Sequence, residues 1–489
     1  MKAEYIVIIA AVFAFIFSQP RSNKKYVDDL KRQKDRAMRP PVDKSLLHAK
    51  PEKGQLMLGK YKGKYVTYPV TDDGNCLILG GSGSGKSANY IIDDLLMNDG
   101  DDCTVCCVDI KGELSFKTQR LDNPAIEIFD PQDHSTIGFD PFYRLSDNPT
   151  EQEKLETMRL VAESMIKIDN STEAYWSLSA RSMLTSLLLY HYDSGYDNLP
   201  DIISAIMSMP IKQEIAEIVN NCEEGSVTRK LIMPYYDLAD DTLTSIFSSI
   251  NIAVNAFFDS NIVWALRDAP RKTNPLHLES GKSLFLRIKE ESLSAYSLLI
   301  SLILNMILTE LSRRPENAKK VLLVIDELPR LIGEGSIGML PKASLTIRSR
   351  RVSLILVTQS LAALEGGFKK PEISTLIANC STKIILDCSA RETANEVLGW
   401  IPKYTQIRST KPTGGKTRNG NVSFDEKARV DSADLMNLIS DGEAIIIHKT
   451  GYYRVKKVPY FADKYLKPQA EAIRRHNEKY FERRSGSDD

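Results

Sequence analysis

The chain has 489 residues, 42% of them hydrophobic, which is enough for two or three domains with sizeable cores. Its 64 Lys and Arg residues balance its 64 Asp and Glu residues, so the net charge is zero. A nucleic-acid partner therefore cannot be inferred from the overall charge and would have to bind a local basic patch. The seven cysteines follow no regular spacing, and Cys103, Cys106 and Cys107 lie in an apolar run without a second pair at zinc spacing, so we expect buried free thiols and no zinc site.

The N-terminus combines an apolar run with a strongly basic segment. Residues 5–17 are uninterrupted and apolar, which is shorter than the ~20 residues that a membrane-spanning helix prefers. Basic residues follow at Arg21, Lys24, Lys25, Lys31, Arg32, Lys34, Arg36 and Arg39. Such residues stay on the cytoplasmic side. We predict a single-pass anchor in the cell membrane at residues 1–20 and a basic juxtamembrane linker at 21–55; a processed or peripheral segment is the alternative.

A complete phosphate-binding sequence follows. Residues 80–87 are Gly80, Gly81, Ser82, Gly83, Ser84, Gly85, Lys86 and Ser87, which match G-x-x-x-x-G-K-S. An apolar run precedes this loop and a helix-compatible segment follows it, so backbone N–H groups and a helix N-terminus would converge on one anion. Lys86 would reach the β- and γ-phosphates of ATP, and the Ser87 hydroxyl would bind Mg²⁺. The alternative is a chance Gly/Ser-rich turn that ends in Lys-Ser.

Strand and helix patterns alternate along the rest of the chain. Apolar runs predict strands near 75–79, 103–109, 125–129, 283–288, 321–325, 352–357, 383–386 and 443–448. Helical periodicity dominates Glu153–Lys167, Tyr175–Asp193 and Thr242–Phe258, and Ser292–Arg313 resembles a crossover helix. This alternation indicates an α/β fold with a mostly parallel, doubly wound sheet and an inserted all-α domain.

The predicted domain boundaries follow from these patterns. The nucleotide-binding domain would comprise 56–144 and 276–463, with the all-α domain at 145–275 between its two parts. A charged helical tail would occupy 464–489. Residues 408–429 are rich in Gly, Lys and Thr without periodicity, and we expect a mobile loop there.

A second apolar strand, 321–325, ends in two acids that would complete a hydrolytic site. Asp326 would hold Mg²⁺ through water, and Glu327 would polarise the attacking water as general base. An accidental match is the alternative, because the pattern is common. Gln359 follows the next predicted strand and would sense the γ-phosphate or align the water; it would otherwise be a helix cap. Asp109, at the end of the strand 103–109, would contact Mg²⁺-bound water or cap the next helix.

A cluster of three arginines is a candidate for catalysis between subunits. Oligomeric ATPases place a cation from a neighbouring subunit on the transition state. One of Arg348, Arg350 and Arg351 would serve, and Arg348 is our candidate. A solvated or DNA-facing helix end is the alternative.

Taken together, these motifs resemble those of the type IV coupling proteins of conjugative transfer systems, the TraG/TraD-type DNA-transfer ATPases. The resemblance covers roughly residues 55–460. It rests on the loop at 80–87, Asp-x-Lys-Gly-Glu at 109–113, Phe139-Asp140-Pro141-Phe142, Trp176, Ile-Asp-Glu-Leu-Pro-Arg-Leu at 325–331, Thr-Gln-Ser at 358–360 and Asn379-Cys380.

The resemblance implies a membrane-anchored, homo-hexameric, RecA-like motor that uses ATP and Mg²⁺. Its partners would be single-stranded DNA with an attached relaxase, components of a type IV secretion channel, and the membrane. By position, Lys86, Ser87, Asp326 and Glu327 would serve binding and hydrolysis, and Gln359 would couple hydrolysis to movement. Family members usually have two N-terminal membrane helices, whereas this sequence shows one short apolar run.

Two other functions fit the same motifs. One is a coupling ATPase that delivers protein substrates to a type IV secretion system. The other is a different RecA-like DNA translocase, of the FtsK or HerA kind. Residues 348–351 and 408–429 are candidate DNA contacts, although a run of charges is usually a solvated face.

Overall fold

The computed structural model describes residues 38–70, 74–98, 103–145, 148–168, 174–332, 336–388, 390–410 and 421–485. The chain forms two compact units. One comprises the described residues between 42 and 397 and between 432 and 485, and the other comprises those between 38 and 41 and between 398 and 431. The predicted membrane anchor at 1–20 and the basic run that follows it, up to residue 37, lie outside the described residues.

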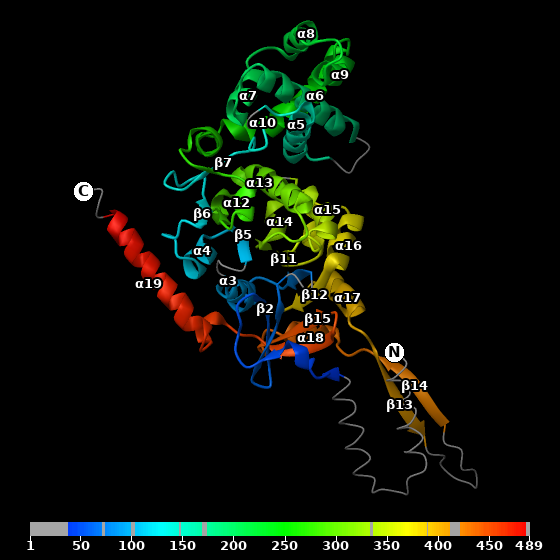
Figure 1. Ribbon diagram of the computed structural model, residues 1–489. Coiled ribbons are helices and arrows are strands. Elements are labelled where there is room, and N and C mark those ends of the chain that lie inside the picture. Colours follow the sequence, from blue (N-terminus) through cyan, green and yellow to red (C-terminus); the bar gives the residue numbers. More distant parts are fainter. Residues whose placement is uncertain are drawn as a thin grey trace. The chain divides into compact units, whose positions relative to one another are not determined.

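A twelve-stranded sheet is the centre of the larger unit (Figure 1). Its order is β1-β3-β2-β16-β15-β12-β4-β11-β10-β5-β9-β6. Neighbouring strands from β12 to β6 are all parallel. These are β4 (Asn75–Leu79), β5 (Cys103–Asp109), β6 (Ile126–Phe129), β9 (Ser283–Arg287), β10 (Lys320–Ile325), β11 (Val352–Thr358) and β12 (Cys380–Ile385). Each overlaps a strand predicted from an apolar run, as expected for the inner strands, such as β4, β5 and β11, which are buried on both faces.

The other half of the sheet is antiparallel, so the sheet is mixed. It contains β1 (Leu47–His48), β2 (Gln55–Tyr61), β3 (Lys64–Pro69), β15 (Glu443–His448) and β16 (Gly451–Lys456). Only β15 is predicted from the sequence, because β1 has just two residues, and Gly, Lys, Thr or Arg leaves only short apolar runs in β2, β3 and β16. The sheet also begins inside the span assigned to the linker, where Val42 and Leu46 are buried.

One core of the protein lies on the face of the sheet that carries the helix after the phosphate loop. The helical turn η2 (Ser87–Ile91) and α3 (Ile92–Met97) pack there with α4 (Glu113–Thr118) and the first turns of α19 (Leu466–Ser485). Alternate residues of the central strands, Leu322 and Val324 of β10 among them, belong to the same core. This packing fixes the helix that leaves the phosphate loop against the sheet.

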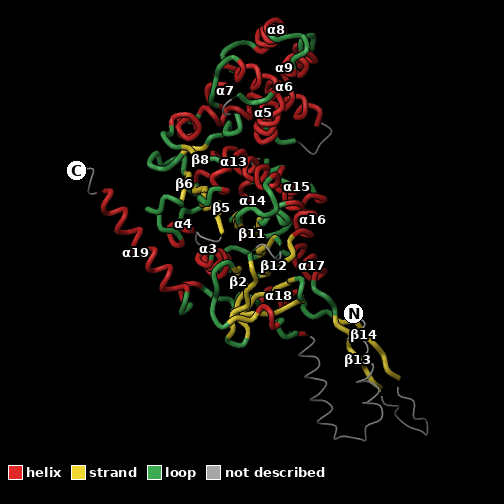
Figure 2. The backbone as a smooth tube through the Cα atoms, in the orientation of Figure 1, coloured by secondary structure: helices red, strands yellow, loops and turns green. Residues whose placement is uncertain are grey.

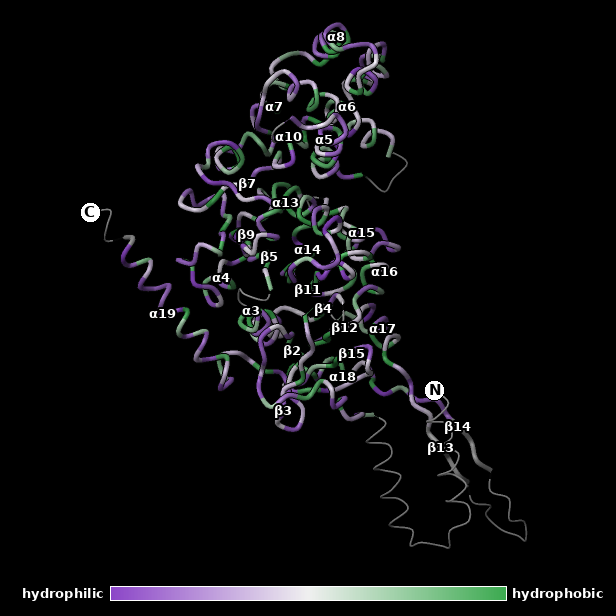
Figure 3. The backbone as a smooth tube through the Cα atoms, viewed as in Figure 1, coloured by the Kyte–Doolittle hydropathy of each residue, from purple (hydrophilic) through white to green (hydrophobic). Residues whose placement is uncertain are grey.

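The helix α13 (Leu293–Arg313) is the crossover helix that the sequence predicts. In the described part of the chain, Glu290–Arg313 is the one unbroken helix long and apolar enough to cross a membrane. It is 78% buried over its most apolar stretch, and it packs against α5, α14 and α15. Figure 3 shows α13 in green and α19 mostly in purple, in keeping with a core helix and a surface helix.

Helices gather in the region predicted to be all-α. They are α5 (Glu151–Met165), α6 (Ala174–Asp193), α7 (Leu199–Ile206), α8 (Ile211–Asn221), α9 (Val227–Ile232) and α10 (Asp240–Val254) (Figure 2). α6 contacts α5, α7, α9 and α10. A capping box between Thr150 and Glu153 starts α5. These helices belong to the same compact unit as the sheet, so a separate all-α domain stays a prediction.

The predicted mobile loop at 408–429 is wrong in its described parts. The backbone forms an antiparallel hairpin of β13 (Tyr404–Thr410) and β14 (Asn421–Lys427), in which Ile407 is opposite Phe424. The alternation of β-branched and aromatic residues with polar ones favours strands here, but the Gly- and Lys-rich stretch between the strands obscured that pattern. Residues 411–420 lie outside the described part.

Candidate active site

The phosphate loop connects β4 directly to the helical turn η2. Gly83 and Gly85 have φ values of 76° and 88°, a backbone conformation that favours glycine. A Cβ on Gly85 would lie 2.2 Å from the Asn89 side chain, and one on Gly80 would lie 2.6 Å from the Ser84 hydroxyl oxygen. The loop therefore needs glycine at these positions. Ser87 begins the helix at the point where N–H groups are free to face an anion.

Lys86 is folded back over this loop. Its Nζ donates hydrogen bonds to the carbonyl oxygens of Gly80 at 2.8 Å and Gly81 at 3.0 Å. Burial lowers the pKa of Lys86, and the nearby carboxylates of Glu327 and Asp326 oppose that shift. The lysine and the two acids are therefore close enough to act in one site.

Asp326 and Glu327 follow the last residue of β10. Burial raises the pKa of Asp326 to about 7, the charge of Glu327 adds to the shift, and Lys86 opposes it. Glu327 has a φ of 59°, a left-handed conformation that is strained for a residue other than glycine. In this position it accepts a hydrogen bond from the Gln359 side-chain amide at its Oε1.

Strand order explains why these residues meet. β11 lies between β4 and β10, and all three strands are parallel. Their carboxyl ends therefore share one edge of the sheet, as in other open α/β sheets. That edge carries the phosphate loop after β4, Gln359 after β11, and Asp326 with Glu327 after β10. The structure thus brings together every predicted catalytic residue except Arg348.

Arg348 lies at the opposite edge of the sheet. It precedes β11, and its Cδ is 3.2 Å from the position that a Cβ on Gly74 would take, just before β4. β11 has seven residues, so about 20 Å separates its two ends. Arg350 and Arg351 lie in the same turn. None of the three can reach the phosphate loop of its own chain.

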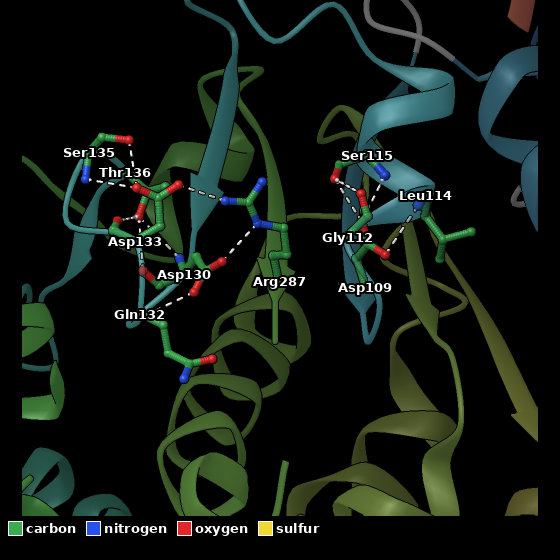
Figure 4. A network of polar contacts seen from close by, with 10 residues as sticks. All are labelled: Asp109, Gly112, Leu114, Ser115, Asp130, Gln132, Asp133, Ser135, Thr136 and Arg287. Carbon is green, nitrogen blue, oxygen red and sulfur yellow. Dashed lines mark hydrogen bonds and ion pairs between the residues drawn. The ribbon is translucent and has the colours of Figure 1, made fainter. Parts of the chain in front are cut away.

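Asp109 caps a helix. It is fully buried, and it accepts hydrogen bonds from the backbone N–H groups of Leu114 and Ser115 and from the Ser115 hydroxyl (Figure 4). Both of its carboxylate oxygens are engaged in these bonds, at 2.7 to 3.2 Å. Of the two alternatives considered from the sequence, the geometry favours the cap over contact with Mg²⁺-bound water.

Sequence reasoning overlooked three groups beside the site. Lys457, after β16, donates to the Ser84 carbonyl oxygen at 3.4 Å. The Asp387 carboxylate lies 3.0 Å from the position of a Cβ on Gly81. Lys111 is close enough to oppose the raised pKa of Asp326. Lys111 is part of a recognised motif. Lys457 and Asp387 lie near the phosphate loop only because of how the strands are arranged in the sheet, and no local sequence pattern indicates them.

The buried free thiols that the sequence predicts are present on β5. Cys103, Cys106 and Cys107 are free thiols buried on β5, and burial raises the pKa of Cys106 to about 12. Within the described ranges, no group of three or more His, Cys, Asp or Glu side chains is arranged to hold a metal ion. The hydroxyl and carboxylate oxygens of Ser87 and Asp326 are ligands that suit Mg²⁺, which usually keeps several waters and binds to phosphates.

Comparison with protein families decides the classification. The model of the family described as "Type IV secretory system Conjugative DNA transfer" matches residues 23–483. The chain belongs to this family. The type IV coupling family inferred from the sequence motifs is therefore confirmed.

Relatives within the conjugative-transfer family are distant. Protein VirD4 of Rhizobium radiobacter is 22% identical over 440 residues, which cover 87% of this chain and 60% of that protein. The type IV secretion system-coupling protein VirD4 of Bartonella henselae is 21% identical over 392 residues, which cover 76% of this chain and 60% of that protein. The chain thus spans about 60% of the length of these curated relatives.

Solved structures of coupling proteins share the fold. The bacterial conjugative coupling protein TrwBdeltaN70 matches with a TM-score of 0.66 and 16% identity, over 84% of this chain and 90% of that one. The plasmid coupling protein TrwB in complex with ADP and Mg²⁺ matches with a TM-score of 0.65 and 16% identity, over 84% and 91%. The fold is that of an α/β P-loop NTPase.

Proposed function

We propose that this chain is a membrane-anchored ATP hydrolase that couples a relaxase–DNA substrate to a type IV secretion channel and drives the transfer of single-stranded DNA. The observation that carries the proposal is the meeting of Lys86, Asp326, Glu327 and Gln359 beside one phosphate loop. Membership in a family described as conjugative DNA transfer supports DNA as the transported substrate. A related protein of the same fold is described in complex with ADP and Mg²⁺, which supports the ligands.

Each residue has a separate task in hydrolysis. The backbone of Gly80–Ser87 cradles the phosphates, and Lys86 exchanges its loop carbonyl partners for the β- and γ-phosphate oxygens. Ser87 and Asp326 would hold Mg²⁺, which would neutralise charge on the phosphates. Glu327 accepts the proton of the attacking water. The hydrogen bond from Gln359 orients the Glu327 carboxylate and couples its position to the end of β11.

We further propose a RecA-like homo-hexamer in the cell membrane, with residues 1–20 as a single-pass anchor and the ATPase domain in the cytoplasm. Arg348 is too far from the phosphate loop of its own chain, so it acts on the site of a neighbouring subunit. In such a ring, hydrolysis in one subunit is sensed by the next, and this suits a motor that threads a strand.

Two alternatives use the same site. A coupling ATPase for protein substrates would hydrolyse ATP without a response to DNA. An FtsK- or HerA-like translocase would respond to DNA but would not need secretion-channel partners. The family description favours conjugative transfer over both.

The test is the ATPase activity of protein lacking residues 1–20, measured with and without single-stranded DNA. We expect ATP hydrolysis that DNA stimulates, with a steep loss of stimulation as salt rises, because backbone contacts release counterions. Lys86→Ala protein is the control for contaminating activity. Hydrolysis that no DNA alters would contradict DNA transfer and favour a protein substrate, and absence of hydrolysis would contradict the enzyme assignment.

A further inference from the structure

The turn between β5 and α4 is fixed at both of its ends. Asp109 closes it at one end by accepting three hydrogen bonds from Leu114 and Ser115. Gly112 closes it at the other end with a φ of 68°, which favours glycine. A Cβ on Gly112 would lie 2.8 Å from the Arg287 side chain, so the backbone and that arginine are in close contact.

Arg287 is itself fixed by two acids (Figure 4). Its Nε and a terminal guanidinium nitrogen donate to Asp130 and Asp133, each at 2.8 Å. Asp133 also accepts from the backbone and hydroxyl of Ser135. The turn therefore rests on a fixed arginine, and its shape does not depend on the exposed residue at its tip.

That exposed residue is Lys111. Its side chain is 63% exposed, and its ammonium is 3.8 Å from Glu290, a loose contact. An exposed ion pair of this kind contributes little to stability. The network of Asp109, which is buried, with Gly112 and Arg287, which are partly buried, thus holds in place a lysine that the fold itself does not require.

The turn lies beside the catalytic acids. β5 is parallel to β10 with Val108 opposite Ile325, so Asp109 lies beside Asp326 and the turn beside Glu327. Burial and the charge of Glu327 raise the pKa of Asp326, and the positive charge of Lys111 opposes this rise. Lys111 is therefore close enough to act electrostatically on the site. Glu290 also pairs with Arg330, just after Glu327.

We propose that Lys111 is a second lysine of the nucleotide site. When a nucleoside triphosphate binds, Lys111 gives up its contact with Glu290 and contacts the terminal phosphate instead. This inference rests on the proposed ATP binding and extends it. A diphosphate lacks the terminal group, so Lys111 discriminates between the two nucleotides. Glu290 is the anion that Lys111 exchanges for phosphate, and its pairing with Arg330 keeps it beside the site.

The test compares affinities for a non-hydrolysable ATP analogue and for ADP, each with Mg²⁺, measured by calorimetry on the full chain in detergent. We expect Lys111→Ala to weaken binding of the analogue about tenfold and of ADP less than about twofold, as for loss of one charge-assisted contact. Lys111→Arg restores most of the difference because the charge is kept. Glu290→Gln strengthens binding of the analogue.

A matched control is Lys64→Ala, which removes an exposed lysine on β3, across the sheet from the site. It should change neither affinity, and the melting temperature of Lys111→Ala should equal that of the wild type. Equal weakening of both nucleotides, or of neither, would overturn the role of Lys111 while wild-type binding still supports the proposed function. Wild-type protein that binds neither nucleotide would overturn the proposed function itself.

Discussion

At the scale of single residues, the two acids after β10 are held in an arrangement that is energetically unfavourable. Glu327 is in a left-handed conformation, and the pKa of Asp326 is raised to about 7 by burial and by the charge of Glu327. Raised pKa values and backbone strain gather at functional sites because the fold holds groups there that it would otherwise place in water. The hydrogen bond from Gln359 stabilises this arrangement.

The raised pKa of Asp326 predicts a dependence of stability on pH. Between about pH 4 and pH 7 the folded protein holds a proton that the unfolded chain releases, so stability falls as pH rises through this window. At pH 8 the buried Asp326 carboxylate is charged, which destabilises the folded state, and Asp326→Asn removes this charge. The substitution should therefore raise the melting temperature at pH 8 but not at pH 4. Calorimetric melting at both values checks this. A similar shift at both would contradict the assigned protonation.

The division of tasks between Lys86 and Glu327 makes a second prediction at this scale. Lys86→Ala and Glu327→Gln should each abolish turnover, because one removes a phosphate contact and the other removes the base. Glu327→Gln should still bind ATP, whereas Lys86→Ala should bind it weakly. Fluorescent-nucleotide titration together with steady-state hydrolysis separates the two. Equal loss of ATP binding in both variants would refute the separate roles.

At the scale of elements, the C-terminal helix α19 is tied to α4, which follows the turn of Lys111. Asn477 is completely buried, and it donates to the carbonyl oxygens of Phe116 and Gln119 and accepts from the N–H of Leu121. Phe481 stacks on Phe116. The charged tail expected from composition is thus helical, and it is docked on the nucleotide-binding core.

Asn477→Leu should destabilise the protein by about 2–3 kcal/mol, because it removes the side-chain partner of the buried Gln119 carbonyl and of the partly buried Phe116 and Leu121 backbone groups. Urea unfolding of the variant measures the loss. Glu478→Gln, an exposed neighbour on the same helix, is the matched control and should be within about 0.5 kcal/mol of the wild type. Equal effects of the two variants would show that the buried amide does not hold α19.

At the scale of the whole molecule, the distance between Arg348 and the phosphate loop raises the question of whether the catalytic site is formed by one chain or shared between two chains. If Arg348 acts on a neighbouring subunit, Arg348→Ala and Lys86→Ala chains are each inactive alone. Mixing them should restore part of the ATPase activity, since some interfaces then join an intact loop to an intact arginine. An activity of Arg348→Ala equal to that of the wild type, or a mixture without recovery, would contradict the assignment.

Much of the candidate active site could be predicted from local sequence. The phosphate loop of 80–87 and the acids after β10 lie beside the strands that present them, so a short window contains both the scaffold and the chemistry. The buried parallel strands were equally visible, because burial on both faces leaves uninterrupted apolar runs. The strands β2 and β3 escaped because Gly59 and Lys60 interrupt the first and Thr67 and Pro69 interrupt the second, so that each has only a short apolar run.

Local residue order is enough to predict the phosphate loop, the pair of acids, the parallel strands and the family. The three-dimensional fold was needed to show that β11 lies between β4 and β10 and so brings Gln359 to Glu327, and that Arg348 lies at the far edge. It also decided that Asp109 caps α4 and that Lys111 projects beside the acids. The reason is physical: each of these facts depends on which strands are neighbours, and contacts between distant segments leave no mark in local residue order.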